Sequence, residues 1–204
     1  MTCLAYLTQF DKEDSLDENF RQDYPLAYYS AEHWISHAKS GDIDGAHDLQ
    51  NLAAHFFQHD RVCINWNRIW DIDLPSWLPA GYLSGAKIVP PLYYASSACL
   101  RVVAQRLLEN DADVNAQGGK YGNALQAASY QGSEAIVKLL IESGADINAQ
   151  GRFYSSVLQA ASYRGSEAVV KLLIELNAKG GEYSRGQAAR RNPRGFQRKR
   201  RRIW

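Results

Sequence analysis

Residues 118–142 read GGKYGNALQAASYQGSEAIVKLLIE, and residues 151–175 read GRFYSSVLQAASYRGSEAVVKLLIE. With a shift of 33 residues, the two stretches are identical at 18 of 25 positions. A fixed period of this length indicates a stacked repeat, in which each unit buries its apolar side only against its neighbours. Stacked repeats bind other proteins more often than they catalyse reactions, so this pattern predicts a binding role.

Each copy predicts a pair of short helices joined by a glycine turn. Asn123 can cap the first helix, because its side-chain oxygen accepts a hydrogen bond from a free backbone amide. Gly132 ends that helix, because glycine reaches positive φ without a Cβ clash. Ser133 is then expected to cap the second helix. The apolar stripe of the second helix has the spacing i, i+3, i+4 and consists of Ile136, Leu139 and Leu140.

The same frame fits one period earlier, where the unit is degenerate. Pro91 falls at the first helical turn, where its missing amide hydrogen costs nothing. Cys99 stands where the later units have glycine, and Arg106 stands where they have leucine. We expect such a unit at the end of an array, where it stacks on one side only or against a different domain.

The helix, glycine turn, helix and following Gly-Ala-Asp-Ile-Asn-Ala segment resemble the ankyrin repeat over about residues 89–175. Where that family has Thr-Pro-Leu-His, this chain has Asn-Ala-Leu-Gln at 123–126 and Ser-Val-Leu-Gln at 156–159. The histidine that ties adjacent loops is therefore a glutamine, which can still donate and accept. The Asp and Gly of the family's hairpin loop are replaced at residues 118–122, which leaves the loop geometry open. The resemblance implies an all-α fold, a short α-solenoid.

This form of the repeat also resembles the arrays of large fungal NACHT-type signalling NTPases. Segments 3–7, 24–28 and 31–38 look like the helical region that joins NTPase to repeats in that family. The resemblance implies a fragment or short relative that has the joint and the first repeats without the motor.

The sequence divides into three predicted parts. Residues 1–87 form an acidic helical linker or capping region, residues 88–180 hold about two and a half to three repeats, and residues 181–204 form a disordered basic tail. The formal net charge of +1 hides this asymmetry. The segment from residue 184 onward has nine basic residues and no acid, which leaves 14 basic and 22 acidic residues before it, a balance of −8.

The front part predicts three longer helices, at 26–39, 47–58 and 61–70. Large apolar rings accompany them, and we expect these rings to pack in a core or to dock onto the first repeat rather than to form a ligand cage. They belong to Trp34, Trp66, Trp70 and Trp77.

Two histidine pairs have the spacing i, i+4 that can share a zinc ion on one helix face. They are His33 with His37 and His55 with His59. A zinc-protease motif needs Glu directly after the first histidine, and neither pair has one or a third ligand in sight. Residues 81–87 also lack the Gly-Lys-Ser/Thr order of a phosphate-binding loop. We therefore expect no enzymatic activity, no catalytic residue, no metal and no cofactor.

The three cysteines and the hydropathy bear on the compartment. Cys3, Cys63 and Cys99 show no CxxC spacing, which favours idle thiols in a reducing compartment. No apolar run approaches the roughly 20 residues that cross a bilayer. We expect a protein of the cytoplasm, or of the nucleus, that does not contact membranes.

Partners in the ankyrin family usually contact the loop tips and the exposed end of the first helix. Aromatic and arginine side chains at those positions suit an interface hot spot with another protein. The tyrosines could instead pack between the loops of adjacent units, and the sequence leaves both readings open. The candidate residues are Lys120, Tyr121, Tyr130, Gln131, Arg152, Phe153, Tyr163 and Arg164.

The tail carries a dense cationic cluster that can act as a nuclear-import signal or contact phosphates. The cluster consists of Arg198, Lys199, Arg200, Arg201 and Arg202. Nucleic acid would be contacted only through this tail. The alternative is a truncated or frame-shifted remnant of a longer array. Four residues equivalent to 143–146 are missing after Glu175, and the likeness between repeats ends at Tyr183.

Overall fold

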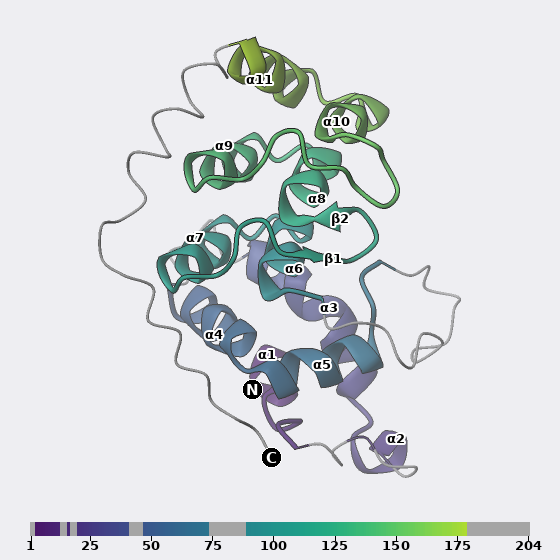
Figure 1. The fold of residues 1–204 in the computed structure, drawn as a ribbon. Coiled ribbons are helices and arrows are strands. Elements are labelled where there is room, and N and C mark those ends of the chain that lie inside the picture. Colours follow the sequence, from purple (N-terminus) through teal and green to yellow (C-terminus); the bar gives the residue numbers. More distant parts are fainter. Residues whose placement is uncertain (1–2, 13–15, 17–19, 41–46, 74–88, 179–204) are drawn as a thin grey trace, which may run out of the picture.

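Three helix pairs stack one behind another along the repeat segment (Figure 1). They are α6 (Pro91–Ser97) with α7 (Arg101–Glu109), α8 (Ala124–Gln131) with α9 (Glu134–Glu142), and α10 (Val157–Arg164) with α11 (Glu167–Ala178). The computed structural model describes residues 3–12, 16, 20–40, 47–73 and 89–178. The stack confirms the predicted all-α solenoid.

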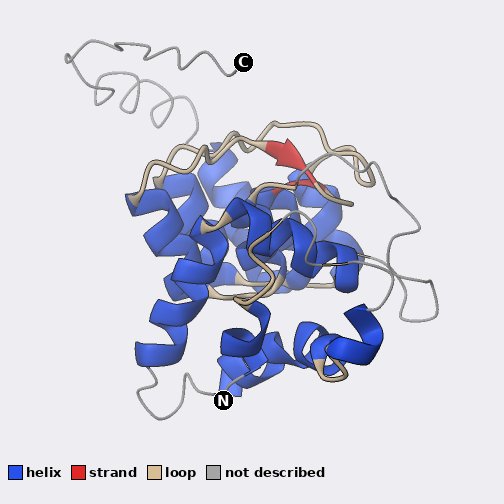
Figure 2. Cartoon of the chain, turned by 90° about the horizontal axis from the view of Figure 1, so that it is seen from below, coloured by secondary structure: helices blue, strands red, loops and turns tan. Residues whose placement is uncertain are grey.

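Within the described residues, the β-structure consists of one small hairpin. β1 (Gln117–Gly118) pairs antiparallel with β2 (Gly122–Asn123), with Gln117 opposite Asn123. The hairpin lies at one edge of the helical stack (Figure 2). The loop at 118–122 therefore forms an antiparallel hairpin despite its unusual sequence.

Five helices precede the repeats: α1 (Cys3–Leu7), α2 (Phe20–Asp23), α3 (Ala27–Ser40), α4 (His47–Gln58) and α5 (Asp60–Ile69). α4 has the predicted bounds, and α3 and α5 lie within one residue of theirs. The first, α1, covers segment 3–7, which resembles part of a helical joining region, and the short α2 is not among the predicted helices.

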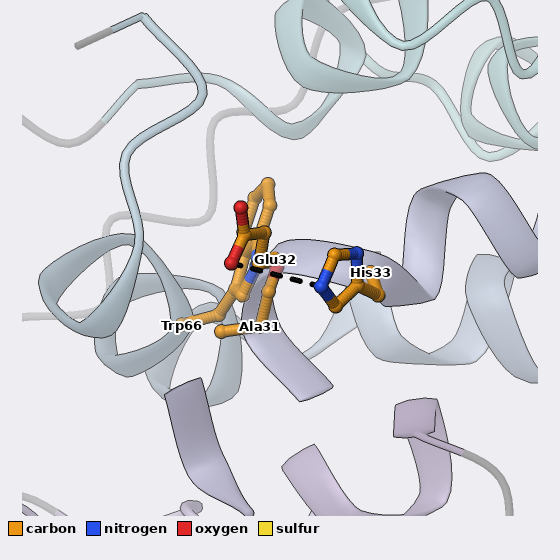
Figure 3. Close-up of polar contacts among 4 residues, drawn as sticks. All are labelled: Ala31, Glu32, His33 and Trp66. Carbon is orange, nitrogen blue, oxygen red and sulfur yellow. Dashed lines mark hydrogen bonds and ion pairs between the residues drawn. The ribbon is translucent and has the colours of Figure 1, made fainter. Parts of the chain in front are cut away.

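Aromatic rings fill the core of the front part. Trp34 and Trp66 are almost fully buried, with ring centroids 5.7 Å apart in an edge-to-face arrangement. The Trp66 indole Nε1 donates a hydrogen bond to the Ala31 carbonyl at 3.0 Å, on the same turn as the exposed Glu32–His33 pair (Figure 3). The prediction of core packing is thus confirmed for both tryptophans. Trp70 is half-buried, and Trp77 lies outside the described residues.

The front part docks onto the first helix pair. The rings of Trp66 and Tyr94 meet edge-to-face with centroids 5.0 Å apart, and α4 packs against α7. Asp73 accepts hydrogen bonds from the Tyr93 hydroxyl, at 2.7 and 2.8 Å from its two oxygens, and from the Lys120 amide at 2.8 Å. We call these three residues the Asp73 latch. Burial raises the pKa of Asp73, although these hydrogen bonds counteract part of the rise.

The caps of the second unit follow the sequence at two of three positions. The Asn123 side chain accepts from the Gln126 amide at 2.8 Å, and Gly132 has φ 75° at the end of α8. Ser133 makes no side-chain cap bond, so that prediction is wrong. Its own amide donates to the Ala128 carbonyl in the turn that closes α8, so α9 starts directly from that turn. Both ends of α8 are therefore set by residues close in sequence, and the next repeat has a cap and a glycine turn at the equivalent positions.

The degenerate first unit makes the same turn without glycine. Cys99 has φ 58°, a left-handed conformation that costs a residue with a Cβ roughly 1–2 kcal/mol. The Leu100 amide still donates to the Ala95 carbonyl, as the Ser133 amide does to Ala128 one unit later. Pro91 lies in the first turn of α6, as predicted. The packing of this unit therefore keeps a strained cysteine in the position that suits glycine.

The second helices bury the predicted stripe. Ile136 and Leu140 are fully buried, and Leu139 is half-buried. The residues equivalent to Leu140 in the first and third units, Leu107 and Leu173, are also buried. All three units therefore place the same leucine in the shared core.

Candidate functional site

A buried glutamine ties the second unit to the loop of the third. The Gln126 side-chain amide donates to the Ala149 carbonyl at 3.1 Å, and Gln126 itself is fully buried. A Cβ on Gly151 would lie 1.7 Å from the Gln126 Oε1, so any larger residue there would displace this side chain from its present position. The glutamine therefore performs the predicted tie between adjacent loops.

An asparagine makes a second tie between units. The Asn115 amide group donates to the Gly144 carbonyl at 3.1 Å, and its oxygen accepts from the Asp146 amide at 2.9 Å. Both groups of this side chain thus bond to the next unit. Together with Gln126, Asn115 fixes the spacing of successive loops, which makes the loop surface stiff.

Four tyrosines from these loops and first helices form a column, which we call the tyrosine column: Tyr121, Tyr130, Tyr154 and Tyr163. Tyr121 and Tyr130 stack with centroids 4.4 Å apart. Tyr130 stacks on Tyr154 at 5.7 Å and lies 6.2 Å from Tyr163. Burial raises the pKa of Tyr121 well above its usual range, so its hydroxyl stays neutral. The column therefore runs from a buried end at Tyr121 to an exposed end at Tyr163, which is 71% exposed.

Cationic side chains lie beside the column. The Lys120 Nζ is 5.6 Å from the Tyr121 ring centroid and 5.5 Å from that of Phe153. The Arg164 guanidinium carbon is 5.6 Å from the Tyr130 ring centroid. Such cation–π contacts contribute about 0.5–1 kcal/mol at exposed sites. Within the described residues, Lys120, Arg152 and Arg164 form no ion pair.

Contacts connect seven of the eight predicted binding residues, all except Gln131, and the eight differ in burial. Tyr121 is buried and Tyr130 half-buried, so these two rings mainly pack between loops. Gln131 is half-buried. The exposed members are Lys120, Arg152, Phe153, Tyr163 and Arg164, with Phe153 60% exposed.

Sequence reasoning missed Tyr154, the buried ring in the middle of the column. It lies 33 residues after Tyr121, so the repeat shift itself could have identified it. The basic cluster predicted at 198–202 lies outside the described residues.

The histidine pairs do not build a larger cluster. The Nε2 atoms of His55 and His59 lie 3.1 Å apart, and His33 lies 3.7 Å from the Glu32 carboxylate. Among the described residues, no group of three or more His, Cys, Asp or Glu side chains could hold a metal ion. In the same part of the chain, no helix has the length and apolar character to cross a membrane.

The repeat geometry agrees with a family comparison. A model of three ankyrin repeats matches residues 84–151 and 126–192, which together span more than half of the 204 residues. The chain belongs to the ankyrin-repeat family. This ankyrin chain is 36% identical to azaphilone pigments biosynthesis cluster protein L of Monascus ruber over 66% of its length. It spans about a third of that relative, 31%.

A solved structure is also similar to this ankyrin chain. It is the ankyrin repeat domain of human ASB11, with 24% identity and a TM-score of 0.42. The similarity covers 63% of this chain and 53% of the human one.

Proposed function

We propose that this ankyrin-repeat protein is a non-catalytic module that binds another protein through the exposed end of the tyrosine column. The observation that carries the proposal is the exposure of Phe153 and Tyr163 beside cations that form no ion pair within the part of the chain that the structure describes. Buried neighbours hold the exposed rings in place. Ordered aromatic side chains lose little conformational entropy on binding, which makes them good anchors.

The charge of this surface favours an acidic partner segment. Lys120 lies beside Phe153, and Arg164 lies beside Tyr130. The glutamates at the starts of the nearby second helices are already paired, Glu134 with Lys138 and Glu167 with Lys171. Complementary charge increases association rates and discriminates against wrong partners. We therefore expect the partner to present carboxylates around an apolar or aromatic side chain.

Partner capture on the immobilised full chain tests this function. Phe153→Ala/Tyr163→Ala should reduce recovery of a partner from host extract at least tenfold, measured by quantitative mass spectrometry. Tyr29→Ala, on α3 and 51% exposed, is the matched control and should change nothing. Recovery from the double variant equal to that from the control would refute the proposed surface.

Charge reversal gives a second, independent readout. Lys120→Glu/Arg164→Glu should weaken capture of the same partner and make it less sensitive to salt, because surface charges are screened within about 8–10 Å at physiological ionic strength. If the salt dependence of partner capture is unchanged, the partner segment is not acidic. That result would not refute binding through the aromatic side chains.

The basic tail favours a second candidate function in the nucleus or on nucleic acid. Its nine basic residues without an acid predict binding to DNA or RNA that weakens steeply with salt. Deleting residues 184–204 should abolish such binding. No binding of the full chain at low salt would dismiss this role.

The likeness to fungal NACHT-ankyrin proteins supports a proposed origin as a short relative or fragment of a signalling NTPase that acts in the cytoplasm or nucleus. The relative in Monascus ruber, which is longer than this chain, is consistent with that origin. Genomic sequence downstream of the codon for Trp204 tests the alternative of a remnant. Further repeats in another reading frame would favour the remnant over a functional tail.

A further inference from the structure

The tip of the β1–β2 hairpin carries two residues of the proposed binding surface, Lys120 and Tyr121. The Lys120 amide donates to the Asp73 carboxylate at 2.8 Å, and the Tyr121 amide donates to the Tyr93 hydroxyl at 3.3 Å. Both acceptors are side chains from outside the hairpin, and Asp73 belongs to the front part, just after α5. The backbone of the tip is therefore held by groups that precede it by 28 and 47 residues.

Tyr93 occupies the position at which the next unit has its tie residue. A shift of 33 residues places Tyr93 on Gln126, whose side-chain amide donates to the loop carbonyl of Ala149. A tyrosine hydroxyl has only one hydrogen to donate, and Tyr93 donates it to the Asp73 carboxylate. Asp73 in turn accepts from the hairpin. The first tie of the array is thus built from one residue of the repeats and one of the front part.

The hairpin tip lies directly on the Tyr93 ring. A Cβ added to Gly119 would lie 2.1 Å from the Tyr93 Cζ, and Gly119 has φ 75°. Both the close contact with a buried ring and the left-handed backbone therefore favour glycine here. Tyr93 is fully buried, and Asp73 is half-buried. A change at either side chain would therefore act directly on the position of the tip.

Backbone contacts connect the tip to the exposed ring of the next loop. The Arg152 amide donates to the Tyr121 carbonyl at 3.3 Å, and a Cβ on Gly122 would lie 2.9 Å from the same amide nitrogen. The loop of the third unit thus packs closely on the hairpin. Phe153 follows Arg152 in that loop, and the Lys120 Nζ lies 5.5 Å from the Phe153 ring centroid. A series of contacts therefore leads from the front part through the hairpin to the exposed aromatic side chain.

The charge of Asp73 strengthens its bonds to the tip. Hydrogen bonds to an ionised acceptor are shorter and roughly twice as strong as neutral ones. Burial raises the pKa of Asp73, and the bonds from the Lys120 amide and the Tyr93 hydroxyl counteract part of the rise. The titratable groups that interact with this carboxylate within the described residues are Asp71 on the same segment, Tyr93 and Tyr94 on α6, and Lys120 and Tyr121 on the hairpin.

We propose that Asp73 is a positioning residue of the binding surface. Its carboxylate holds the hairpin tip at the place where Lys120 reaches the Phe153 ring and where the third loop packs on the hairpin. The front part is then a component of the binding site and not only a cover for the first repeat. This inference rests on the proposed binding through the exposed end of the tyrosine column.

Solution NMR of the full chain tests the positioning without a partner. The amide proton of Lys120 should move upfield as Asp73 takes up a proton, because its hydrogen bond to the carboxylate weakens. The methylene protons of the Lys120 side chain should be shifted upfield by the ring currents of Tyr121 and Phe153, whose centroids lie 5.6 and 5.5 Å from its Nζ. Both signals therefore report where the tip lies.

Two variants and a control make these signals decisive. Asp73→Asn should abolish the pH-dependent shift of the Lys120 amide, reduce the ring-current shift and move the Arg152 amide signal. Tyr93→Phe keeps the ring under the tip and removes only the hydroxyl, so it should move the same signals less. Asp23→Asn, at an exposed residue of α2, is the matched control and should change none of them.

Signals of α9 that stay in place show that a variant is folded. If the Lys120 amide titrates in Asp73→Asn as it does in the wild type, or if the Arg152 signal does not move, the series of contacts from the front part is wrong.

Partner capture supplies the second arm. For the protein that the wild-type chain recovers from host extract, Asp73→Asn should lower recovery roughly threefold to tenfold, because a tip that is no longer held must be ordered on binding. Asp23→Asn should leave recovery unchanged. Equal recovery with Asp73→Asn and wild type, while Phe153→Ala/Tyr163→Ala still lowers it, overturns the positioning role and leaves the proposed function standing. Recovery that Phe153→Ala/Tyr163→Ala does not lower refutes the proposed function, and with it the role of Asp73 in binding.

Discussion

One leucine occurs twice in the same helical context, which allows a stability experiment with an internal control. Leu125 and Leu158 occupy equivalent positions in α8 and α10, and both are followed by Gln-Ala-Ala-Ser-Tyr. The first is 1% exposed and the second 42% exposed. We expect Leu125→Ala to lower the free energy of unfolding far more than Leu158→Ala.

The magnitudes follow from burial. Removing the side chain of a fully buried leucine costs about 2–5 kcal/mol, because the lost transfer energy is accompanied by a cavity. At Leu158 the outer side of the side chain already faces solvent, so no closed cavity forms. Only part of the roughly 0.8 kcal/mol per buried CH₂ is lost, or about 1 kcal/mol in total. The two variants should therefore differ by about 1–4 kcal/mol, while the helix propensity of alanine contributes equally to both.

Urea unfolding followed by circular dichroism at 222 nm measures the difference. The slopes of the transitions must agree between variants for the comparison to hold. Equal losses at the two positions would refute the reasoning, because they would mean that Leu158 is covered in solution. A small loss at Leu125 would mean that the second and third units do not stack.

Other predictions concern caps, turns and protons. Asn123→Ala should lower the unfolding free energy by about 0.5–2 kcal/mol, whereas Ser133→Ala, which removes no cap bond, should change it by only a few tenths; urea unfolding separates them. Gly165→Ala should cost about 1–2 kcal/mol from backbone strain alone, because φ is 73° there and an added Cβ meets nothing within 4 Å; a neutral result would show that the turn relaxes. Burial raises the pKa of Asp71 and Asp73, so the folded chain holds their protons more tightly than the unfolded one. Their contribution to stability should increase as pH falls through the folded pKa toward 3.8. The melting temperature of the wild type, relative to that of Asp71→Asn/Asp73→Asn, should therefore increase as pH falls over the same range.

Local chemistry made parts of the fold predictable. The bounds of α4 follow from its apolar periodicity, and the ends of α8 follow from a capping asparagine and a glycine. Ser133 shows where the same logic fails. It lies at the N-cap position of α9 and is of a residue type that suits a cap, yet its side chain makes no cap bond.

Contacts between distant segments were not predictable from pattern alone. Asp73 lies just beyond the last predicted front helix, at 61–70, where the sequence analysis assigns no role, yet it bonds to Tyr93 and to the amide of Lys120. At the candidate site the aromatic residues could be chosen from the repeat, but their roles could not. Tyr121 and Tyr163 differ in exposure because the third unit packs over Tyr121, whereas no later unit within the described residues packs over Tyr163.

The Asp73 latch, the Trp66–Tyr94 contact and the packing of α4 on α7 attach the front helices non-covalently to the repeats. We expect these contacts to keep the parts assembled without peptide linkage between positions 73 and 89. Two separately synthesised pieces, 1–73 and 89–204, should reconstitute a single particle when co-expressed. Assembly of the two pieces in cells would then report whether the repeat array is intact, and it could be screened by complementation.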